Sequence, residues 1–363
     1  MLITCIELDA VHVNHRGDWL FVRLQTDAGL EGLGEMKAGR NYGQSVAALR
    51  RLGQQLQGLD PAPIEALIHR FKAGDADHIN ALCAIEQALW DLAGKKYQVP
   101  LHVLLGGPCR GDIRLYANIN RATTDRTPEG FARNAQAAVA EGFDAVKLAP
   151  FDGLPAQTDS AQQARQGIAC MEAVRQAIGP DIDLLVDCHS RFSLKGALEV
   201  AQALRPLDLY WFEQPVPESD REACLAVKDQ CGMTIAGGES RRWRSDFAEV
   251  CQYGTMDVIM PDVKLVGGIG ELKKVGEMAA AWDIPTAPHG PSGPVSQAAG
   301  VEAMLALPQF LILEYGWGEV PWRPQLVEPA ETIVKGRLKS SGRPGLGLEL
   351  NPDMVEAHRV ALD

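Results

Sequence analysis

Three apolar runs in the middle of the chain each end in an acidic residue: IDLLVD (182–187), LDLYWFE (207–213) and MTIAGGE (233–239). The acids are Asp187, Glu213 and Glu239, and the interval between them is 26 residues both times. That length accommodates a buried strand, a turn, a helix of about ten residues and a second turn. The spacing therefore predicts three successive βα units, with one carboxylate at the C-terminal end of each strand.

The same alternation of strand and helix extends from about residue 111 onward. The candidate strands are IRLYANI, DAVKLAP, IDLLVDC, LYWFEQP, MTIAGGE, MDVIMPD, IPTAPHG and FLILEYG. Amphipathic segments such as TPEGFARNAQAAVAEG fill most of the gaps, which is typical of parallel strands in a barrel. Because no long helical segment follows FLILEYG, we expect a modified (β/α)7β barrel over residues 111–322.

The first third of the chain has a different pattern. LITCIELDAVHV and WLFVRLQTD alternate apolar and polar residues, as half-buried antiparallel strands do, and residues 44–97 have a helical pattern. We expect residues 1–110 to form an α+β capping domain. The tail, residues 323–363, is expected to return to this domain.

Charge and composition exclude several classes of protein. The chain of 363 residues has a formal net charge of −12 and no long cluster of Lys and Arg, which argues against nucleic-acid binding. It has neither an 18-residue apolar run nor a signal-peptide pattern, so no membrane association is expected. Its eight cysteines show no CxxC pairing, which favours free thiols in a reducing cytoplasm.

The three carboxylates predict a metal site. The C-terminal ends of barrel strands meet at one face, where the active site lies. Three hard oxygen ligands converging there would suit Mg²⁺. Three unrelated surface acids are the alternative, but each acid follows a run that is typical of a buried strand.

Several motifs together resemble the enolase superfamily and, within it, the mandelate-racemase-like subgroup. They are VDCH, FEQP and GGES around the three acids, the AVK strand, and the PD pair followed by GG. AIEQALWDLAGKKYQVPLHVLLGG resembles the stretch that joins the cap to the barrel in that family. The resemblance runs essentially end to end. It implies Mg²⁺ held by the three acids, removal of a proton α to a substrate carboxylate, and a homo-oligomer.

Two histidines carry the acid–base chemistry that the resemblance implies. His289, in PTAPHGP, and Asp262, in IMPD, lie at neighbouring strand ends and resemble the His–Asp dyad that serves as general base. His189 follows a metal ligand by two positions, as in the family's acid-sugar dehydratases, where it protonates the departing β-hydroxyl. Strand alternation predicts that His189 and Asp187 share one side.

Further charged residues are expected around the substrate. Racemases of the subgroup typically carry K-x-K on the second strand, but here Lys147 is followed by Ala149, which disfavours a two-base racemase. Lys147 would then be a cation near the substrate carboxylate. Lys264 is a candidate second cation, and the resemblance implies that Glu314 hydrogen-bonds the substrate carboxylate.

Loops near the predicted barrel mouth supply the remaining candidates. In the cap, NHRGDW (14–19) and MKAGRNYG (36–43) fit the positions of two loops that close over family active sites. The candidate substrate contacts from these loops and from the loop after the eighth strand are His15, Arg16, Trp19, Arg40 and Trp317.

We therefore expect a Mg²⁺-dependent dehydratase that converts a small polyhydroxy carboxylate into a 2-keto-3-deoxy acid. A racemase or epimerase of the same superfamily, acting on a hydroxy or imino acid, is the alternative, because a base on each face would suffice. A barrel that binds a metal or metabolite without catalysis would have no need of a His–Asp base.

Overall fold

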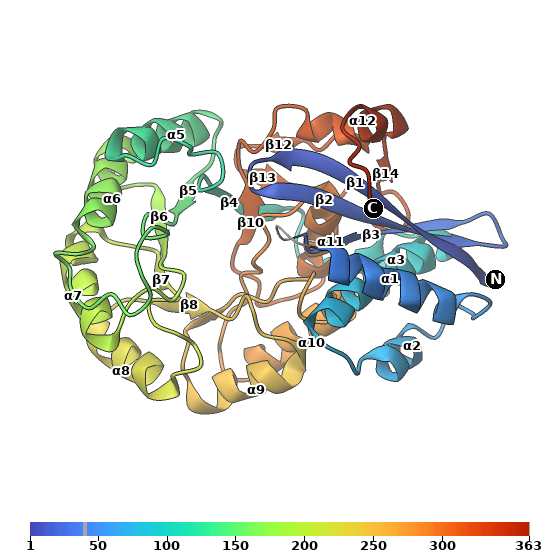
Figure 1. Cartoon of the computed structure of the whole chain (residues 1–363), viewed down its shortest axis with the longest axis horizontal. Helices are drawn as coiled ribbons and strands as arrows, with labels where there is room; N and C mark the ends of the chain where they lie inside the picture. The colour runs from blue at the N-terminus through green and yellow to red at the C-terminus, as the bar shows by residue number, and fades with distance from the viewer. Residues whose placement is uncertain (39–41, 363) are drawn as a thin grey trace.

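The computed structural model describes residues 1–38 and 42–362. The N-terminal part is an antiparallel sheet, in the order β1-β2-β3, packed against helices (Figure 1). Its elements are β1 (Ile3–Asn14), β2 (Gly17–Thr26), β3 (Glu31–Met36), α1 (Gly43–Leu56), α2 (Ile64–Phe71), α3 (Ala76–Tyr97) and α4 (Leu101–Leu104). This is the capping domain that the sequence predicts.

Two glycines let β3 lie directly on α3. A Cβ on Gly34 would come within 2.0 Å of the Ala84 carbonyl oxygen, and one on Gly32 within 2.1 Å of the Ala88 carbonyl oxygen. Only glycine permits such a close approach of two backbones. The buried face of α3 then closes the cap core, in which Leu82, among others, is almost fully buried.

The second part is a ring of parallel strands surrounded by helices (Figure 1). Its strands are β4 (Ile113–Asn118), β5 (Ala145–Leu148), β6 (Asp183–Asp187), β7 (Trp211–Glu213), β8 (Ile235–Gly237), β9 (Val258–Ile259) and β10 (Leu313–Gly316). Its helices are α5 (Pro128–Ala140), α6 (Arg165–Ile178), α7 (Leu194–Leu204), α8 (Arg221–Cys231), α9 (Trp243–Tyr253), α10 (Ile269–Ala280) and α11 (Pro294–Leu305). Strand β10 pairs with β4 and closes the ring.

The seventh predicted strand, IPTAPHG, is reduced to single bridges. Thr286 pairs with Ile259 on one side and with Phe310 on the other, and no regular strand forms around it. Proline lacks a backbone N–H, so Pro285 and Pro288 cannot donate to the neighbouring strands. The ring is still hydrogen-bonded at this position, because Thr286 donates to Gln309 and accepts from Leu311.

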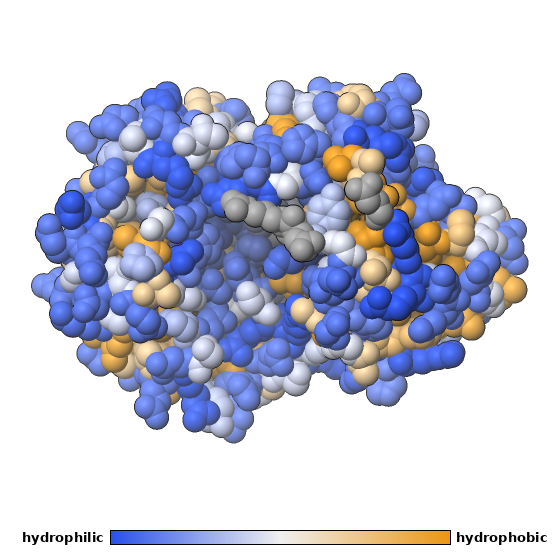
Figure 2. All heavy atoms as spheres, in the orientation of Figure 1, coloured by the Kyte–Doolittle hydropathy of each residue, from blue (hydrophilic) through white to orange (hydrophobic). Residues whose placement is uncertain are grey.

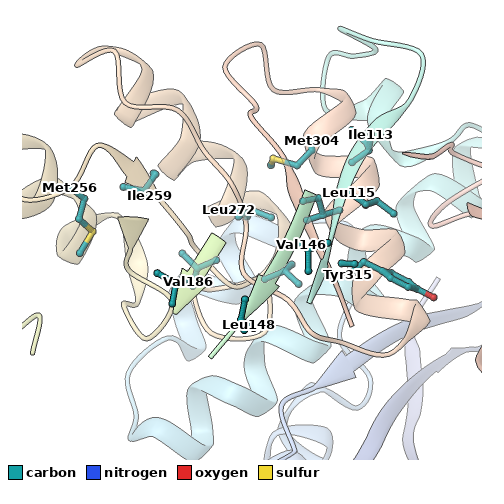
Figure 3. Packing of buried hydrophobic residues seen from close by; sticks show 14 of the residues in the cluster. Ile113, Leu115, Val146, Leu148, Val186, Met256, Ile259, Leu272, Met304 and Tyr315 are labelled. Atoms are coloured by element: carbon teal, nitrogen blue, oxygen red, sulfur yellow. The ribbon is translucent and has the colours of Figure 1, made fainter. Parts of the chain in front are cut away.

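Alternation along the barrel strands creates two apolar layers. One set of side chains faces the helices, including Leu115, Val146 and Val186 (Figure 3). The other set forms a separate cluster, including Tyr116, Leu185 and Trp211. Polar residues in step with the second set therefore point into the barrel, and this places the site.

After β10 the described chain, to residue 362, contains only short elements, so the barrel lacks the helix of an eighth unit. These are η2 (Arg323–Leu326), β11 (Val327–Glu328), β12 (Ile333–Val334), β13 (Arg337–Leu338), β14 (Glu349–Leu350) and α12 (Pro352–Ala357). Strand β13 pairs with β4. The end of the tail reaches the cap, where the Val360 N–H donates to the Ala10 carbonyl at 2.8 Å.

Two buried cap carboxylates bind the N-terminal ends of barrel helices. Glu35 accepts from the backbone N–H groups of Gly293 and Ser296, at 2.7 and 2.9 Å, at the start of α11. Glu86 accepts from the N–H groups of Ile269 and Gly270, at 2.6 and 2.8 Å, at the start of α10. Free N–H groups and the helix dipole both favour an acid there. These contacts fix the cap over the barrel.

The GG pair of the sequence has a clear role in this docking. Gly268 has φ +96°, and a Cβ at this position would lie 2.0 Å from Oε2 of Glu86. A side chain here would therefore displace the carboxylate that caps α10. The motif marks a cap–barrel contact as well as a turn.

Burial, the largest cause, raises the pKa of Glu86 to about 8, although its N–H donors oppose the shift. A carboxyl group whose pKa is higher in the folded chain than the unfolded value of about 4.3 stabilises the fold at low pH and loses that contribution as the pH rises. We expect the free energy of unfolding to fall between about pH 5 and pH 8, by up to about 1.4 kcal/mol per pH unit from this group.

Urea unfolding of Glu86→Gln at several pH values in this window tests the expectation. The substitution should flatten the pH dependence relative to wild type, because glutamine does not titrate, although it lowers stability at low pH. Glu172→Gln, on the exposed face of α6, is the matched control and should keep the wild-type slope. Parallel curves for wild type and Glu86→Gln would contradict the expectation.

The described part of the chain, residues 1–38 and 42–362, contains no helix with the length and apolar character required to cross a bilayer. All eight cysteines are free, and six of them are buried.

Candidate active site

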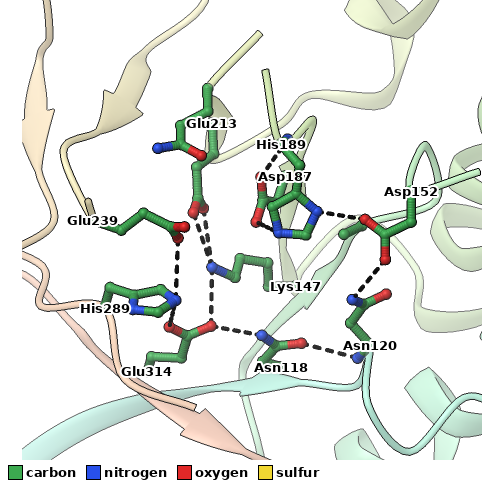
Figure 4. A network of polar contacts seen from close by, with 12 residues as sticks. Asn118, Asn120, Lys147, Asp152, Asp187, His189, Glu213, Glu239, His289 and Glu314 are labelled. Atoms are coloured by element: carbon green, nitrogen blue, oxygen red, sulfur yellow. Dashed lines mark hydrogen bonds and ion pairs between the residues drawn. The ribbon is translucent and has the colours of Figure 1, made fainter. Parts of the chain in front are cut away.

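Asp187, Glu213 and Glu239 converge at the C-terminal ends of β6, β7 and β8. One carboxylate oxygen from each lies within 4.8 Å of the others. Asp187 and Glu213 are the last residues of their strands and are cross-strand neighbours, and Glu239 follows β8 by two residues. The spacing in the sequence thus becomes a compact cluster (Figure 4).

The chemistry of this cluster fits a divalent cation. Burial and the neighbouring Asp187 raise the pKa of Glu213 to about 8, because a third negative charge is hard to hold there. Oε2 of Glu239 is buried, and His289 Nε2 lies 3.1 Å from it. A hard cation would neutralise the charge of the cluster, so the three carboxylates are consistent with a divalent metal site.

Lys147 lies beneath the cluster on β5, with only 1% of its surface exposed. Its Nζ is 3.1 Å from Oε1 of Glu213 and 2.9 Å from Oε1 of Glu314. Although burial opposes it, these two carboxylates hold the pKa of Lys147 well above its usual value. Lys147 is therefore a fixed cation, engaged by two acids.

Glu314, on β10, is held by three donors and lies near a fourth group, His289. Besides Lys147, its carboxylate accepts from Asn118 Nδ2 at 2.6 Å and from the Gly290 N–H at 2.8 Å, and His289 Nε2 lies 3.8 Å away. Burial alone would raise its pKa, but Lys147 and His289 outweigh burial and lower it to about 2. Glu314 is thus a paired carboxylate.

His289 and Asp262 form the predicted pair. His289 Nδ1 is 2.8 Å from Oδ2 of Asp262, so Nε2 points toward the cluster, 3.1 Å from Oε2 of Glu239. Burial would lower the pKa of His289, but Glu239, Glu314 and Asp262 outweigh burial and raise it to about 9. A cation held by Glu239 would cancel the largest of these attractions.

His189 lies on the other side of the cluster (Figure 4). Its Nε2 is 2.8 Å from Oδ2 of Asp187, and its Nδ1 contacts Oδ1 of Asp152. Both ring nitrogens face carboxylate oxygens, which only accept hydrogen bonds, so a doubly protonated ring satisfies both. These acids outweigh burial and raise the pKa of His189 to about 11.

His189 shares a side with Asp187 because of a turn, and not because of strand alternation as predicted. Strand β6 ends at Asp187, and His189 has φ +45°, so the chain has already left the extended conformation. The imidazole reaches Asp187 because this turn folds back: the His189 N–H donates to Oδ1 of Asp187 at 2.8 Å. Lys264 likewise lies in a turn, beyond the end of β9, and not in a strand.

The other predicted substrate contacts, Lys264, Trp19 and Trp317, each have partners outside the carboxylate cluster. Lys264 is buried, with Nζ 3.9 Å from Oε1 of Glu35 in the cap. Trp19 is 4% exposed and packs edge-on against Trp322 in the core. The indole N–H of Trp317 donates to Glu141 at 2.8 Å. The structure does not bring Trp19 or Trp317 to the carboxylate cluster.

The β1–β2 turn supplies two more candidates. Arg16 reaches the barrel, where its NH2 group lies 3.6 Å from Oδ2 of Asp152, whereas His15 is exposed. Arg40 lies outside the described residues. Figure 2 shows a hollow between the barrel and the cap, surrounded mostly by hydrophilic residues. A substrate held there would contact both domains.

Sequence reasoning missed Asp152, Asn120 and Asn118. They lie at or beyond the C-terminal ends of β4 and β5, on the same face as the predicted acids. Asn118 is the last residue of β4, so the strand-end argument applied to the first strand would have found it. No comparable signal marks Asp152, which belongs to a longer loop.

Comparison with known proteins identifies the class that this fold and site define. Residues 130–354 match the family described as "Enolase C-terminal domain-like", and residues 7–106 match "Mandelate racemase / muconate lactonizing enzyme, N-terminal domain". The chain belongs to the mandelate racemase/muconate lactonizing enzyme group of the enolase superfamily.

Individual relatives agree with this assignment. The chain is 32% identical to D-xylonate dehydratase of Haloferax volcanii, over 99% of this chain and 89% of that one. It is 30% identical to D-gluconate dehydratase of Thermoproteus tenax, over 94% and 70%. The crystal structure of a mandelate racemase/muconate lactonizing enzyme from Jannaschia sp. CCS1 superposes with a TM-score of 0.91, at 29% identity, over 99% of this chain and 98% of that one.

Proposed function

We propose that this enzyme is a Mg²⁺-dependent dehydratase of a small sugar acid, which it converts to a 2-keto-3-deoxy acid. The observation that carries the proposal is the placement of two histidines on opposite sides of the carboxylate cluster, each with Nε2 directed inward. One can remove a proton while the other delivers one. Relatives at about 30% identity are xylonate, gluconate and galactonate dehydratases, which favours aldonic acids as substrates.

Each residue has a definite task in this reaction. Asp187, Glu213 and Glu239 would hold the cation, whose positive charge stabilises the negative charge that develops on the substrate carboxylate as the α-proton leaves. His289 Nε2 takes the α-proton, while Asp262 holds the ring through Nδ1. His189 gives a proton to the β-hydroxyl as the C–O bond breaks, so water leaves. The resulting enol tautomerises to the keto acid.

The alternative, a racemase or epimerase, needs a second base in place of an acid. Lys147 is a poor candidate, since it is paired with two buried carboxylates, and Ala149 replaces the second lysine that racemases of the subgroup carry. His189 is surrounded by acids that favour its protonated form, which suits a proton donor. These features favour elimination over epimerisation.

His189→Asn separates the two functions. Under the dehydratase proposal the variant should form keto acid more slowly by on the order of 10²-fold or more, because hydroxide without a proton donor is a poor leaving group. Exchange of the α-proton with solvent deuterium should survive, because His289 and the three carboxylates are intact. NMR in deuterium oxide and a keto-acid assay measure the two steps.

Wild type should first be screened against five- and six-carbon aldonic acids and against hydroxyprolines to find the substrate for these measurements. Inversion of the α-centre without release of any keto acid would reject the dehydratase in favour of the epimerase. Loss of exchange in His189→Asn would show that His189 takes part in proton removal.

A further inference from the structure

The two inward-facing histidines are held in the same way. Each has Nδ1 against an aspartate and Nε2 directed toward the carboxylate cluster: His289 against Asp262, and His189 against Asp152 (Figure 4). Asp152 lies four residues beyond the end of β5. It is not one of the three clustered carboxylates, and its side-chain partners are Arg16, Asn120, Arg126 and His189.

We propose that Asp152 is the positioning residue of His189: its carboxylate contacts Nδ1 and fixes the ring so that Nε2 faces the substrate. This inference rests on the proposed function, in which His189 is the proton donor. It makes the site a pair of His–Asp dyads, one for the base and one for the acid.

The two oxygens of Asp152 have separate partners. Oδ2 lies 3.2 Å from Asn120 Nδ2, 3.1 Å from Arg126 NH2 and 3.6 Å from Arg16 NH2. Oδ1 contacts the imidazole of His189. Two donors and the ion pair with Arg16 therefore hold one carboxylate oxygen and leave the other to the ring.

The support behind Asp152 is itself rigid. Arg126 donates to Oδ1 of Asn120 at 2.8 Å and to the Ala149 carbonyl at 2.5 Å. The Asn120 N–H donates to Oδ1 of Asn118, whose amide donates to Glu314. The network thus reaches from His189 across the barrel mouth to the opposite side of the site. Such extended support is what a catalytic geometry requires.

The cap takes part through Arg16, on the β1–β2 turn. It is the residue of the described cap that forms an ion pair with Asp152. The cap thereby contributes a charge behind the acid dyad, in the hollow where a substrate would lie. Asp152 connects the orientation of His189 to the presence of the cap over the barrel.

Asp152→Asn is the decisive substitution, because the amide cannot satisfy both sides. Arg126 and Asn120 are donors, so the amide oxygen should turn toward them and the NH2 group toward His189. Nδ1 of His189 would then face a donor in place of an acceptor. The ring loses the hydrogen bond that orients it, so proton donation should fail while the fold remains.

Three measurements follow for Asp152→Asn. The kcat for keto-acid formation should fall on the order of 10²-fold or more, with KM changed by less than about threefold. The α-proton exchange with solvent deuterium should stay at the rate seen in His189→Asn. In ¹⁵N-histidine spectra of the metal-free protein, the Nδ1–H signal of His189, assigned by its absence in His189→Asn, should disappear.

Two further variants complete the experiment. Asp125→Asn removes an exposed aspartate that pairs with Arg133 at 3.0 Å and should leave every readout unchanged. Asp152→Glu keeps the charge and should retain the Nδ1–H signal, with a kcat above that of Asp152→Asn. It also covers the case in which the asparagine variant does not fold.

The outcomes are distinguishable. A wild-type kcat or a retained Nδ1–H signal in Asp152→Asn overturns the inference, and so does an equal loss of exchange and elimination in a folded Asp152→Asn. If wild type forms no keto acid from any acid sugar, the proposed function fails, yet the NMR comparison still decides whether Asp152 holds the Nδ1 proton.

Discussion

Replacing His289 with asparagine should abolish exchange of the substrate α-proton with solvent deuterium. His289 Nε2 is the ring nitrogen that points into the carboxylate cluster, and Asn has no group that can take a proton. Elimination depends on this step, so keto-acid formation should also fall below detection. NMR of the α-proton signal in deuterium oxide, with enzyme and acid sugar incubated for hours, measures the result.

Asp262→Asn should have a partial effect on the same exchange. Asp262 contacts Nδ1 of His289 and is itself fixed by the Lys264 N–H at 2.7 Å. Its loss removes both orientation and a charge that favours the protonated ring, so exchange should weaken on the order of 10²-fold or more. Exchange at the wild-type rate in His289→Asn would instead assign the base to Lys147 or Lys264.

The position of the site was predictable because it depends on regular structure. A repeat of one strand and one helix has a nearly constant length, so acids at equal spacing come to neighbouring strand ends. Lys147, Glu213 and Glu314 follow from the same rule, because they lie in or at the end of short buried strands. The contacts among these three residues were also predictable, since strand alternation directs their side chains into the barrel interior.

What could not be predicted lies beyond the strand ends. His189 reaches its position through a turn with positive φ, and Asp152 lies in a loop that is tied to the next loop by the Thr158–Phe192 bridge. The periodic pattern of apolar residues in the sequence predicts neither loop conformation. Lys264 and Trp19 show the same limit, since their partners are set by tertiary contacts: Lys264 lies 3.9 Å from Glu35 at the cap–barrel contact, and Trp19 is buried against Trp322.

The cap–barrel contacts also could not be predicted from sequence patterns. Glu35 and Glu86 belong to apolar stretches of the cap, and nothing in those stretches reveals that each acid meets a helix start further along the chain, 261 residues away for Glu35 and 183 for Glu86. Their helix-capping role depends on tertiary contact. The GG pair after Asp262 indicated a special backbone at this place, but not its partner.

Removal of the divalent cation should abolish both exchange and elimination, and Glu213→Gln should have the same effect at any Mg²⁺ concentration in a practical range. Three carboxylate oxygens within 4.8 Å of one another are a site built on charge, and one neutral ligand weakens it. Dialysis against EDTA, followed by readdition of Mg²⁺ or Mn²⁺, should remove and restore activity in wild type. Full turnover after rigorous metal removal would refute both the metal site and the proposed reaction.

Calorimetric titration with Mn²⁺ separates lost binding from misfolding in Glu213→Gln. The affinity of Glu213→Gln for Mn²⁺ should fall at least on the order of 10²-fold, while Glu222→Gln, on the exposed face of α8, should bind Mn²⁺ as wild type does.

Without metal, Glu213→Gln should nevertheless be at least as stable as wild type. Burial and Asp187 raise the pKa of Glu213 to about 8, so its charge is costly without a cation, and Lys147 keeps Glu314 as a partner. Wild type should gain thermal stability on addition of Mg²⁺, because a ligand that binds only the folded state stabilises it, whereas Glu213→Gln should gain little.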